Sequence, residues 1–256
     1  SAARALGISL VYEKFAVEPE ALNDAVRAKH AEGIDGYNLT VPHKQAIMPL
    51  LDDVSPEAHA IGAVNTVVKT PTGYVGHNTD APGFVRSLEE AGLELGGLRV
   101  TILGAGGAAR AALVGLAKAG AATITVVARR PEQAQAMVES LRGQSRAPLQ
   151  WRALTDARDP FAQSDLLVQA TSATLESNPG ADAFADSLPM DALPPSAAVV
   201  DMVYQPLRTS VLAKAQERGL QTIDGLGMLL HQGAIAFEMW TGATPSLEVM
   251  RHALAG

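Results

Sequence analysis

The pattern of hydrophobic and polar positions separates this chain into three regions, the last of which is the final apolar stretch. Up to about residue 80, strand-like and helical patterns follow each other and end in a hairpin. From residue 98 to 225, short runs of β-branched residues recur with helical segments between them. This second rhythm is typical of a parallel sheet with helices on both faces, so it predicts an α/β protein with a doubly wound sheet.

The hairpin of the first region is predicted from its turn signal, Pro71-Thr72-Gly73. The next helix is predicted to start at about Pro82, with Thr79 or Asp80 as its cap, and to end near Gly92. The other elements predicted for this region are a helix tail at the opening residues, a strand at 10–17, a helix at 19–32, a strand at 34–41 and the hairpin at 63–79.

In the second region, the β-branched runs are predicted to be strands and the segments between them helices. The segment 177–196, rich in Pro, Gly and Asp, is predicted to be a loop or a short helix over the sheet. The final apolar stretch, 225–242, is predicted to be a helix that carries several polar groups. The predicted strands lie within 99–107, 123–130, 164–172, 197–204 and 220–225, and a helix is predicted at 109–120.

Composition and charge exclude several functions. The 256-residue chain carries a net charge of −7 and no Lys/Arg-rich run, so we expect no nucleic-acid partner and no anionic membrane. Its most apolar stretch is broken by Gly115, Lys118 and Gly120, and therefore does not predict a membrane span.

The absence of cysteine excludes disulfides, thiolate metal ligands and a Cys nucleophile. It also fits a reducing compartment, so we expect a cytoplasmic protein. The six histidines show no metal-binding spacing, and we expect no metal.

A glycine-rich turn follows the first strand of the second region. It reads G-x-G-x-x-A, with Gly104, Gly106 and Ala109 at the fixed positions, and it opens a predicted helix. Glycines there let backbone amides approach a pyrophosphate, which is stabilised by the helix N-terminus. A second strand follows at the expected distance, so the pattern predicts a dinucleotide site in a Rossmann-type domain. The alternative is a tight strand–helix turn that binds no ligand.

The end of the next strand carries two cations, Arg129 and Arg130, and no carboxylate appears before Glu132. An NAD site usually has an acidic residue at this point for the ribose hydroxyls, whereas guanidinium groups pair with a 2′-phosphate. NADP is therefore favoured over NAD as the cofactor. The alternative, a solvated basic helix start, is disfavoured because a cation at a helix N-terminus needs a counter-anion.

Polar residues gather at the strand ends of the first region, in three segments. Any one segment alone would be a satisfied turn or cap, but three together suggest a cleft for a small, highly hydroxylated molecule. The segments provide Asn38, Thr40 and Lys44 in "GYNLTVPHK", Asn65 and Thr66 in "IGAVNT", and Asn78 and Asp80 in "GHNTD".

An alcohol dehydrogenase also needs a group that takes the hydroxyl proton as hydride leaves. A Tyr-x-x-x-Lys motif is absent, because Tyr204 is followed four residues later by Arg208, and a Cys-bound zinc is impossible. Lys44 with Asp80 is the best remaining acid/base pair. The alternative for these two residues is a surface lysine and an N-cap aspartate.

Seven motifs in this order resemble the shikimate dehydrogenase family: "NLTVPHK", "IGAVNT", "GHNTD", "GAGGAAR", "QATS", "DMVYQP" and "GLGMLLHQGAIAFEMWTG". The resemblance extends from about residue 10 to the C-terminus. It implies NADPH-dependent, reversible reduction of 3-dehydroshikimate to shikimate, in the aromatic amino-acid pathway. It also implies a substrate domain of mixed sheet, at 1–82 plus about 228–256, and an NADP-binding domain at 83–227.

The resemblance implies roles for individual residues in catalysis, in substrate binding and in cofactor binding. Lys44 and Asp80 are implied to be the catalytic pair. The implied substrate-binding residues are Asn38, Thr40, Lys44, Asn65, Asp80, Tyr204 and Gln232. The implied cofactor-binding residues are Gly104, Ala105, Gly106, Gly107, Ala108 and Ala109 at the pyrophosphate, Arg129 and Arg130 at the 2′-phosphate, and Thr171, Met202, Gly225 and Met228 beside the nicotinamide.

The chain departs from the family pattern at two places. The usual Asn-Arg-Thr/Arg motif reads Ala128-Arg129-Arg130, which removes a polar contact near the cofactor but keeps both cations. The family's Ser-x-Ser-Pro motif, which binds the substrate carboxylate, would lie ahead of Ser1, so we expect a leading segment there.

Two alternative functions stay open: a quinate/shikimate dehydrogenase that uses NAD, and a non-catalytic NADP-binding protein that lacks the Ser-x-Ser-Pro motif. A monomer or a homodimer is expected.

Overall fold

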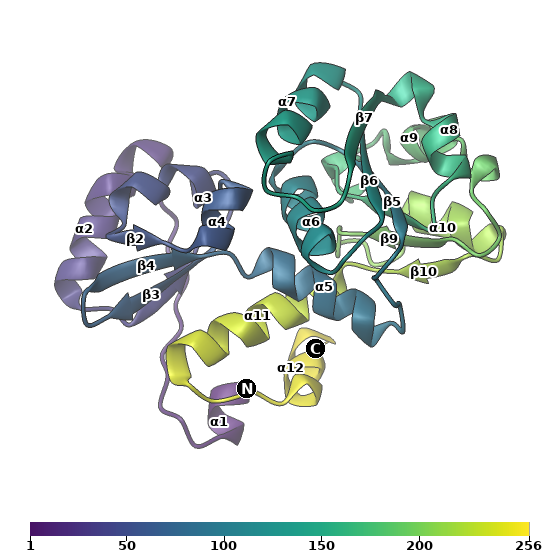
Figure 1. The fold of residues 1–256 in the computed structure, drawn as a ribbon. Helices are drawn as coiled ribbons and strands as arrows, with labels where there is room; N and C mark the ends of the chain where they lie inside the picture. The colour runs from purple at the N-terminus through teal and green to yellow at the C-terminus, as the bar shows by residue number, and fades with distance from the viewer. Residues whose placement is uncertain (256) are drawn as a thin grey trace. The chain divides into compact units, whose positions relative to one another are not determined.

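The computed structural model describes residues 1–255, which divide into two compact units (Figure 1). The first unit comprises Ser1–Gly83 and the chain from Leu230 onward, and the second comprises Phe84–Leu229. Two helices, α5 (Asp80–Glu90) and α11 (Leu226–Thr241), each begin in one unit and end in the other. The chain therefore leaves the first unit through α5 and returns to it through α11.

The first unit is built on a four-stranded mixed sheet, in the order β1-β3-β4-β2. β3 pairs antiparallel with both β1 and β4, whereas β2 runs parallel to β4. Its elements are α1 (Ala2–Ala5), η1 (Pro19–Ala21), α2 (Leu22–Glu32), β1 (Gly36–Asn38), α3 (His43–Ala46), η2 (Met48–Leu50), β2 (Asp53–Val54), α4 (Pro56–Ile61), β3 (Thr66–Thr70), β4 (Gly73–His77) and α12 (Leu247–Ala255).

The core of the first unit lies between α2 and this sheet. Leu22 and Val26 stand one turn apart on α2, so both face the same side of the helix. They are buried in one cluster with Val67 of β3 and Tyr74 of β4. The predicted hairpin is confirmed, because β3 and β4 are joined by a short turn and pair along their whole length.

Two of the predicted elements are wrong or too long. Residues 10–17 form no strand of the described sheet, and Val11 in this segment is 83% exposed. The β-branched and aromatic residues there indicate β propensity, but a strand also needs a partner, which local sequence does not supply. The strand predicted at 34–41 is only three residues long as β1, since the chain turns at Val41–Pro42 and enters the short helix α3.

The second unit is built on a six-stranded parallel sheet, in the order β10-β9-β8-β5-β6-β7. This is the strand order of doubly wound dinucleotide-binding folds. Besides parts of α5 and α11, its elements are β5 (Arg99–Leu103), α6 (Gly107–Lys118), β6 (Thr123–Ala128), α7 (Pro131–Leu141), β7 (Leu149–Ala153), η3 (Leu154–Asp156), α8 (Arg158–Ala162), β8 (Leu166–Gln169), η4 (Ser172–Thr174), α9 (Ala181–Ser187), η5 (Met190–Ala192), β9 (Ala198–Asp201), α10 (Ser210–Glu217) and β10 (Gln221–Ile223).

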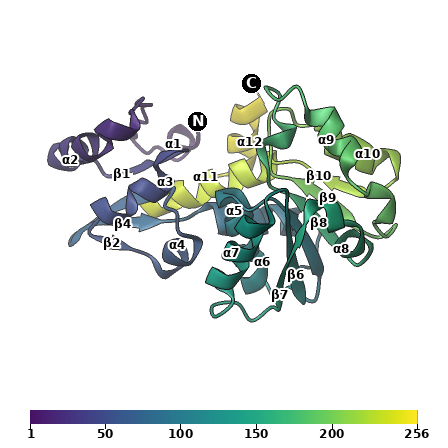
Figure 2. The ribbon, with the colours of Figure 1, turned by 90° about the horizontal axis from the view of Figure 1, so that it is seen from above.

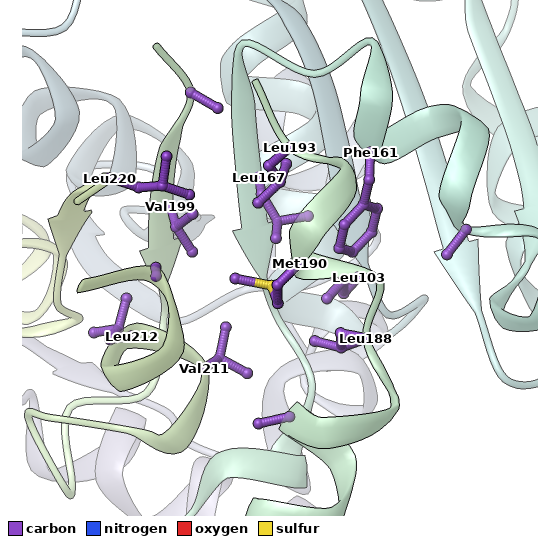
Figure 3. Packing of buried hydrophobic residues seen from close by; sticks show 14 of the residues in the cluster. Leu103, Phe161, Leu167, Leu188, Met190, Leu193, Val199, Val211, Leu212 and Leu220 are labelled. Carbon is purple, nitrogen blue, oxygen red and sulfur yellow. The ribbon is translucent and has the colours of Figure 1, made fainter. Parts of the chain in front are cut away.

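Helices cover both faces of the parallel sheet, as predicted. α6 and α7 lie on one face, and α8, α9 and α10 lie on the other (Figure 2). On the second face, Phe161 of α8 and Val211 of α10 pack with Leu167 and Val199 of the sheet (Figure 3). The segment 177–196 contains α9 and η5, and Met190 from it completes this cluster. None of the helices within residues 1–255 is long and apolar enough to cross a membrane.

The sequence pattern did not predict strand β7, which forms one edge of the parallel sheet. Its residues, Leu149–Ala153, alternate between buried or half-buried and exposed positions. Polar residues Gln150 and Arg152 alternate here with apolar ones, as in a half-solvated edge strand, but the short segment lacks the β-branched run of the other strands. Its pairing with β6 establishes it as a strand.

Candidate active site

Lys44 and Asp80 meet in the first unit. Lys44 stands on α3, and Asp80 is the first residue of α5. The ammonium Nζ lies 2.7 Å from the carboxylate Oδ2, and the two side chains are 28% and 15% exposed. The pair is thus shielded from bulk water but open enough for a small molecule to reach it. The other possibility was a surface lysine and an N-cap aspartate. The structure pairs the two side chains, and their catalytic role stays a prediction.

Asn65 holds the second oxygen of Asp80. Its amide Nδ2 donates to Asp80 Oδ1 at 2.9 Å and to Thr79 Oγ1 at 3.0 Å. Its Oδ1 accepts from the backbone amide of Thr79 at 2.8 Å. Asn65 is 3% exposed, and these bonds use both of its amide hydrogens. The geometry therefore gives Asn65 a positioning role toward Asp80, in addition to its predicted substrate contact.

Asn38 belongs to the same network of polar side chains. Its Nδ2 donates to the carbonyl of Asn65 and to Thr66 Oγ1, both at 3.0 Å. Its Oδ1 accepts from the hydroxyl of Tyr12 at 2.9 Å. Tyr12 lies in the extended segment that precedes η1, and partial burial raises the pKa of its hydroxyl group. The hydroxyl is therefore a hydrogen-bond donor over the physiological pH range, and it fixes the orientation of the Asn38 amide.

Gln232 and Thr40 complete the predicted residues of the first unit. Gln232 comes from α11, and Thr79 Oγ1 donates to its Oε1 at 3.4 Å. Gly83 makes this approach possible, because a Cβ on Gly83 would lie 2.7 Å from the backbone nitrogen of Gln232. Thr40 is exposed at the turn before α3. Tyr204 lies on the second unit, so its predicted substrate contact stays a prediction.

The cap of α5 is the side chain of Asn78 rather than of Thr79 or Asp80. Asn78 Oδ1 accepts from the backbone amides of Asp80 at 3.0 Å and Ala81 at 3.3 Å. Its Nδ2 donates to the carbonyl of Ala63. This arrangement leaves the Asp80 carboxylate free of a capping role, so both of its oxygens can serve the site.

The glycine turn of the second unit fits a pyrophosphate. Gly106 is the N-cap of α6 and no side chain among the described residues caps this helix end. Gly106 and Gly107 are exposed, and a Cβ on either would meet no atom within 4 Å. Gly104 has φ +107°, a conformation that favours glycine. The open helix N-terminus, with its backbone amides and its dipole, suits an anionic group.

Arg129 and Arg130 follow β6, and Arg130 is the N-cap of α7. Both side chains are exposed on the same edge of the sheet as the glycine turn, because β5 and β6 are parallel neighbours. Guanidinium groups pair well with phosphate, so two cations at this point suit the predicted contact with a 2′-phosphate. No carboxylate comes between β6 and Glu132.

The residues predicted to lie beside the nicotinamide follow the other strands at this edge. Thr171 comes after β8, and its Cγ2 would lie 2.8 Å from a Cβ on Gly104. Met202 comes after β9, and its carbonyl would lie 2.6 Å from a Cβ on Gly225, which follows β10. Met228 is half-buried on the first turn of α11. Carboxyl ends of parallel strands are where ligands bind in open α/β sheets.

Sequence reasoning missed two residues of the polar network, Tyr12 and Thr79. Tyr12 lies in a predicted strand that does not form, and the sequence indicates Thr79 only as a possible helix cap. Thr79 is fully buried, and its hydroxyl contacts Asn65, Thr66 and Gln232. The sequence signal that could have indicated Thr79 is a hydroxyl residue between an amide and a carboxylate, Asn78 and Asp80, directly after a predicted strand. No three His, Asp or Glu side chains of the described chain could together hold a metal ion.

A parallel sheet with an open glycine turn, and a separate polar site around an ammonium–carboxylate pair, define the class of this protein. They are the two sites that a nicotinamide-dependent dehydrogenase requires, one for the dinucleotide and one for proton transfer at an alcohol or ketone.

Comparison with known proteins narrows this class. Family models match the chain as the shikimate dehydrogenase substrate binding domain at 1–67, shikimate/quinate 5-dehydrogenase at 87–178 and the shikimate 5′-dehydrogenase C-terminal domain at 225–255. Shikimate dehydrogenase (NADP(+)) of Geobacter metallireducens is 42% identical over 98% of this chain and 88% of its own length.

Solved structures agree with these matches. Shikimate 5-dehydrogenase of Listeria monocytogenes, in complex with shikimate and NAD, is 36% identical with a TM-score of 0.92, over 99% of this chain and 89% of that one. The enzyme of Thermus thermophilus, in complex with NADP(H) and shikimate, is 39% identical with a TM-score of 0.85, over 99% and 90%. The chain belongs to the shikimate dehydrogenase family.

Proposed function

We propose that this chain catalyses the NADP-dependent, reversible reduction of 3-dehydroshikimate to shikimate in aromatic amino-acid biosynthesis. The proposal rests on family membership, on the relative named shikimate dehydrogenase (NADP(+)), and on the Thermus structure that holds NADP(H) and shikimate. One observation in this chain carries it furthest. The Lys44 ammonium lies 2.7 Å from the Asp80 carboxylate, whose other oxygen is held by Asn65.

In the reduction, Lys44 would donate a proton from Nζ to the carbonyl oxygen of the substrate, and in the oxidation it would recover that proton. Asp80 holds Nζ in place through one oxygen and is itself fixed through the other. A bound NADPH supplies the hydride that makes the new C–H bond. The amides and hydroxyls around the pair would bind the ring hydroxyls, with Asn38, Thr40, Asn65 and Gln232 as the residues concerned.

We assign substrate binding to a domain of residues 1–82 plus about 228–256, and NADP binding to 83–227. The glycine turn would hold the pyrophosphate, and Arg129 and Arg130 the 2′-phosphate. The exposed guanidinium groups at the start of α7 and the missing acidic residue favour NADP over NAD. Tyr204 would approach the substrate from the second unit, while Thr171, Met202, Gly225 and Met228 would line the nicotinamide side.

The localisation and the oligomeric state are also part of the proposal. We propose a cytoplasmic enzyme, because its chain has no cysteine and its relatives act on a small metabolite. It would work as a monomer or a homodimer, which light scattering after size-exclusion chromatography distinguishes.

A quinate/shikimate dehydrogenase that uses NAD is the nearest rival function. The ratio of the rates with quinate and with shikimate separates this rival from the proposed function.

The role of Lys44 is tested by comparing Lys44→Ala with Lys69→Ala. Lys69 is an exposed lysine of the same unit whose Nζ donates to the carbonyl of Gly33, so it is a matched control. Lys44→Ala should lower kcat for shikimate oxidation by about a hundredfold or more, because it removes the proton-transfer group. The Kd for NADP⁺ should change little. If Lys44→Ala and Lys69→Ala turned over at the same rate, Lys44 would have no part in the chemistry.

A further inference from the structure

Two polar side chains lie side by side at the carboxyl edge of the parallel sheet, outside both sites described above. Gln169 is the last residue of β8 and Asp201 is the last residue of β9, and the two are register partners. Both are 0% exposed. Burial of polar groups is costly unless they are paired, so a side-by-side buried amide and carboxyl need a reason to be there.

Gln169 binds the backbone of the loop that follows its own strand. Its Oε1 accepts from the amide of Thr171 at 2.7 Å, and its Nε2 donates to the carbonyl of Thr171 at 3.0 Å. The same Nε2 donates to Thr174 Oγ1 at 2.8 Å. A single side chain therefore binds both the backbone amide and the backbone carbonyl of Thr171. This fixes Thr171, whose own hydroxyl caps η4 by accepting from the Ala173 amide.

Asp201 binds the loop that follows β9 in a similar way. Its Oδ1 accepts from the amide of Val203 at 3.0 Å and from Gln169 Nε2 at 3.3 Å. Its Oδ2 is buried and makes no hydrogen bond with any residue of the described part of the chain. Burial raises the pKa of the Asp201 carboxyl. Interactions with the Val203 amide and with the hydroxyls of Thr209 and Thr174 lower it and partly oppose that rise.

The two loops held in this way carry residues proposed to line the nicotinamide. Thr171 is pressed against Gly104 of the glycine turn. The backbone of Met202 and Val203 packs against Gly225, where a Cβ would lie 2.6 to 2.7 Å from their carbonyl groups. A shift of either loop would therefore move Thr171 or Met202 relative to the glycine turn and to Gly225. The adenosine end, at Arg129 and Arg130, lies on a loop that neither buried side chain contacts.

We propose that Gln169 and Asp201 are a pair of positioning residues that hold the loops after β8 and β9 in the arrangement the nicotinamide end of the cofactor needs. The inference rests on the proposed function. It adds that binding of the adenosine 2′-phosphate end and correct placement of the nicotinamide end depend on different residues of the same unit. Loss of the pair should uncouple the two.

Three variants test the pair: Asp201→Leu, Gln169→Leu and Asp201→Asn. The two Leu variants should lower kcat with NADP⁺ and shikimate by about tenfold or more, because a displacement of about 1 Å at a reacting group has effects of that size or larger. The inhibition constant of adenosine 2′,5′-bisphosphate, which has the 2′-phosphate but no nicotinamide, should stay at the wild-type value. Asp201→Asn keeps the acceptor for the Val203 amide, so it should restore most of the turnover.

Ser164→Ala is the matched control for loss of a buried polar group. Ser164 is buried, lies just before β8 at the opposite end of the strand, and shares a hydrogen bond of 2.6 Å with Thr101. This variant should lose stability without lowering kcat. The proposal is overturned if the Leu variants weaken bisphosphate binding by the same factor as they lower kcat, or if turnover stays at the wild-type level.

Hydrogen exchange separates this inference from the proposed reaction. The backbone amides of Thr171 and Val203 each donate to one member of the pair, so they should exchange faster in Gln169→Leu and Asp201→Leu, respectively. This readout needs no turnover. If wild-type protein did not oxidise shikimate, the proposed function would fail while exchange still tested the pair. Unchanged exchange at both amides would overturn the positioning role in either case.

Discussion

Asn65 is the residue on which the geometry of the candidate active site depends most. It is buried and bonded through all of its polar atoms, and one of its partners is the carboxylate that holds Lys44. A single amide thus connects the end of the loop before β3 to the start of α5. The Lys44–Asp80 pair is kept in place by a neutral group, which adds no charge next to Asp80.

We predict that Asn65→Asp disrupts this arrangement, although it hardly changes the volume of the side chain. A second carboxylate would lie beside Asp80 Oδ1, at the place where the amide now donates at 2.9 Å. The free energy of unfolding should fall by about 1–3 kcal/mol, as expected when a buried donor is removed from its acceptors, and kcat should fall with it. Urea unfolding and initial rates measure both effects.

Asn23→Asp is the control for this variant, because Asn23 is exposed on α2. It should behave as wild type in both measurements. The account of Asn65 would be wrong if Asn65→Asp were as stable and as active as Asn23→Asp.

At the scale of elements, the glycine turn combines an unusual backbone conformation with a close contact. Gly104 and Gly120 both have positive φ, +107° and +87°, so alanine at either position is strained by about 1–2 kcal/mol. They differ in their surroundings. A Cβ on Gly104 would lie 2.8 Å from Thr171 Cγ2, whereas one on Gly120 would be 3.8 Å from its nearest neighbour.

We therefore predict that Gly104→Ala and Gly120→Ala lose similar stability from backbone strain but differ in cofactor binding. Gly104→Ala should weaken NADP⁺ binding by about tenfold or more, because it displaces both the turn and Thr171. Gly120→Ala should bind NADP⁺ as wild type does. Isothermal titration gives the two Kd values. Equal affinities in the two variants would show that the turn does not contact the cofactor.

A second element-scale feature is the ion pair that connects the start of β5 with the residue before β8. The Arg99 side chain donates to both carboxylate oxygens of Asp165, and the Arg99 backbone amide donates to one of them. These hydrogen bonds lower the pKa of Asp165 from its usual 3.8. A carboxyl whose pKa is lowered by folding stabilises the protein above its unfolded pKa, and that stabilisation is lost as the pH falls through the folded pKa.

We predict that Asp165→Asn is less stable than wild type at about pH 7 and that the difference shrinks by about pH 3. The effect should be small, because both side chains are partly exposed and water screens the pair. Urea unfolding at the two pH values measures it. A difference that stayed constant between them would mean that the charge of Asp165 does not contribute.

Elements with a strong local signal could be predicted from the sequence, and elements defined by pairing could not. The hairpin at Thr66–His77 and the strand–turn–helix around Gly104 were confirmed, because turn chemistry and periodicity specify both locally. Residues 10–17 are rich in aromatic and β-branched residues but have no partner in the described sheet, whereas β7 has a partner but no β-branched run. Pairing is a non-local property that a single stretch does not reveal.

For the whole molecule, the parts of each site come from distant stretches of chain. Lys44 and Asp80 are 36 residues apart, and Thr79 and Gln232 are 153 apart. Residue patterns alone left Lys44 and Asp80 open between a catalytic pair and a surface lysine with a capping aspartate. The family resemblance favoured the pair, and the structure brings the two side chains into contact.

The buried Gln169–Asp201 pair shows what sequence reasoning did not reach at this scale. Both residues stand in motifs that carry the family resemblance, "QATS" and "DMVYQP", but the sequence pattern gives neither of them a role. The two side chains meet only because β8 and β9 are neighbours in the sheet, which places Gln169 and Asp201 in register. A polar residue at the end of a buried strand is a weak signal until the sheet order is known.

The proposed reaction is tested by the initial rate of nicotinamide reduction with shikimate, with NADP⁺ and NAD⁺ compared on wild type and Lys44→Ala. We expect a clear rate with NADP⁺, a much lower rate with NAD⁺, and loss of both in the variant. We also expect a lower rate with quinate than with shikimate. No rate with either cofactor, or a rate that survives the loss of Lys44, would contradict the proposed reaction.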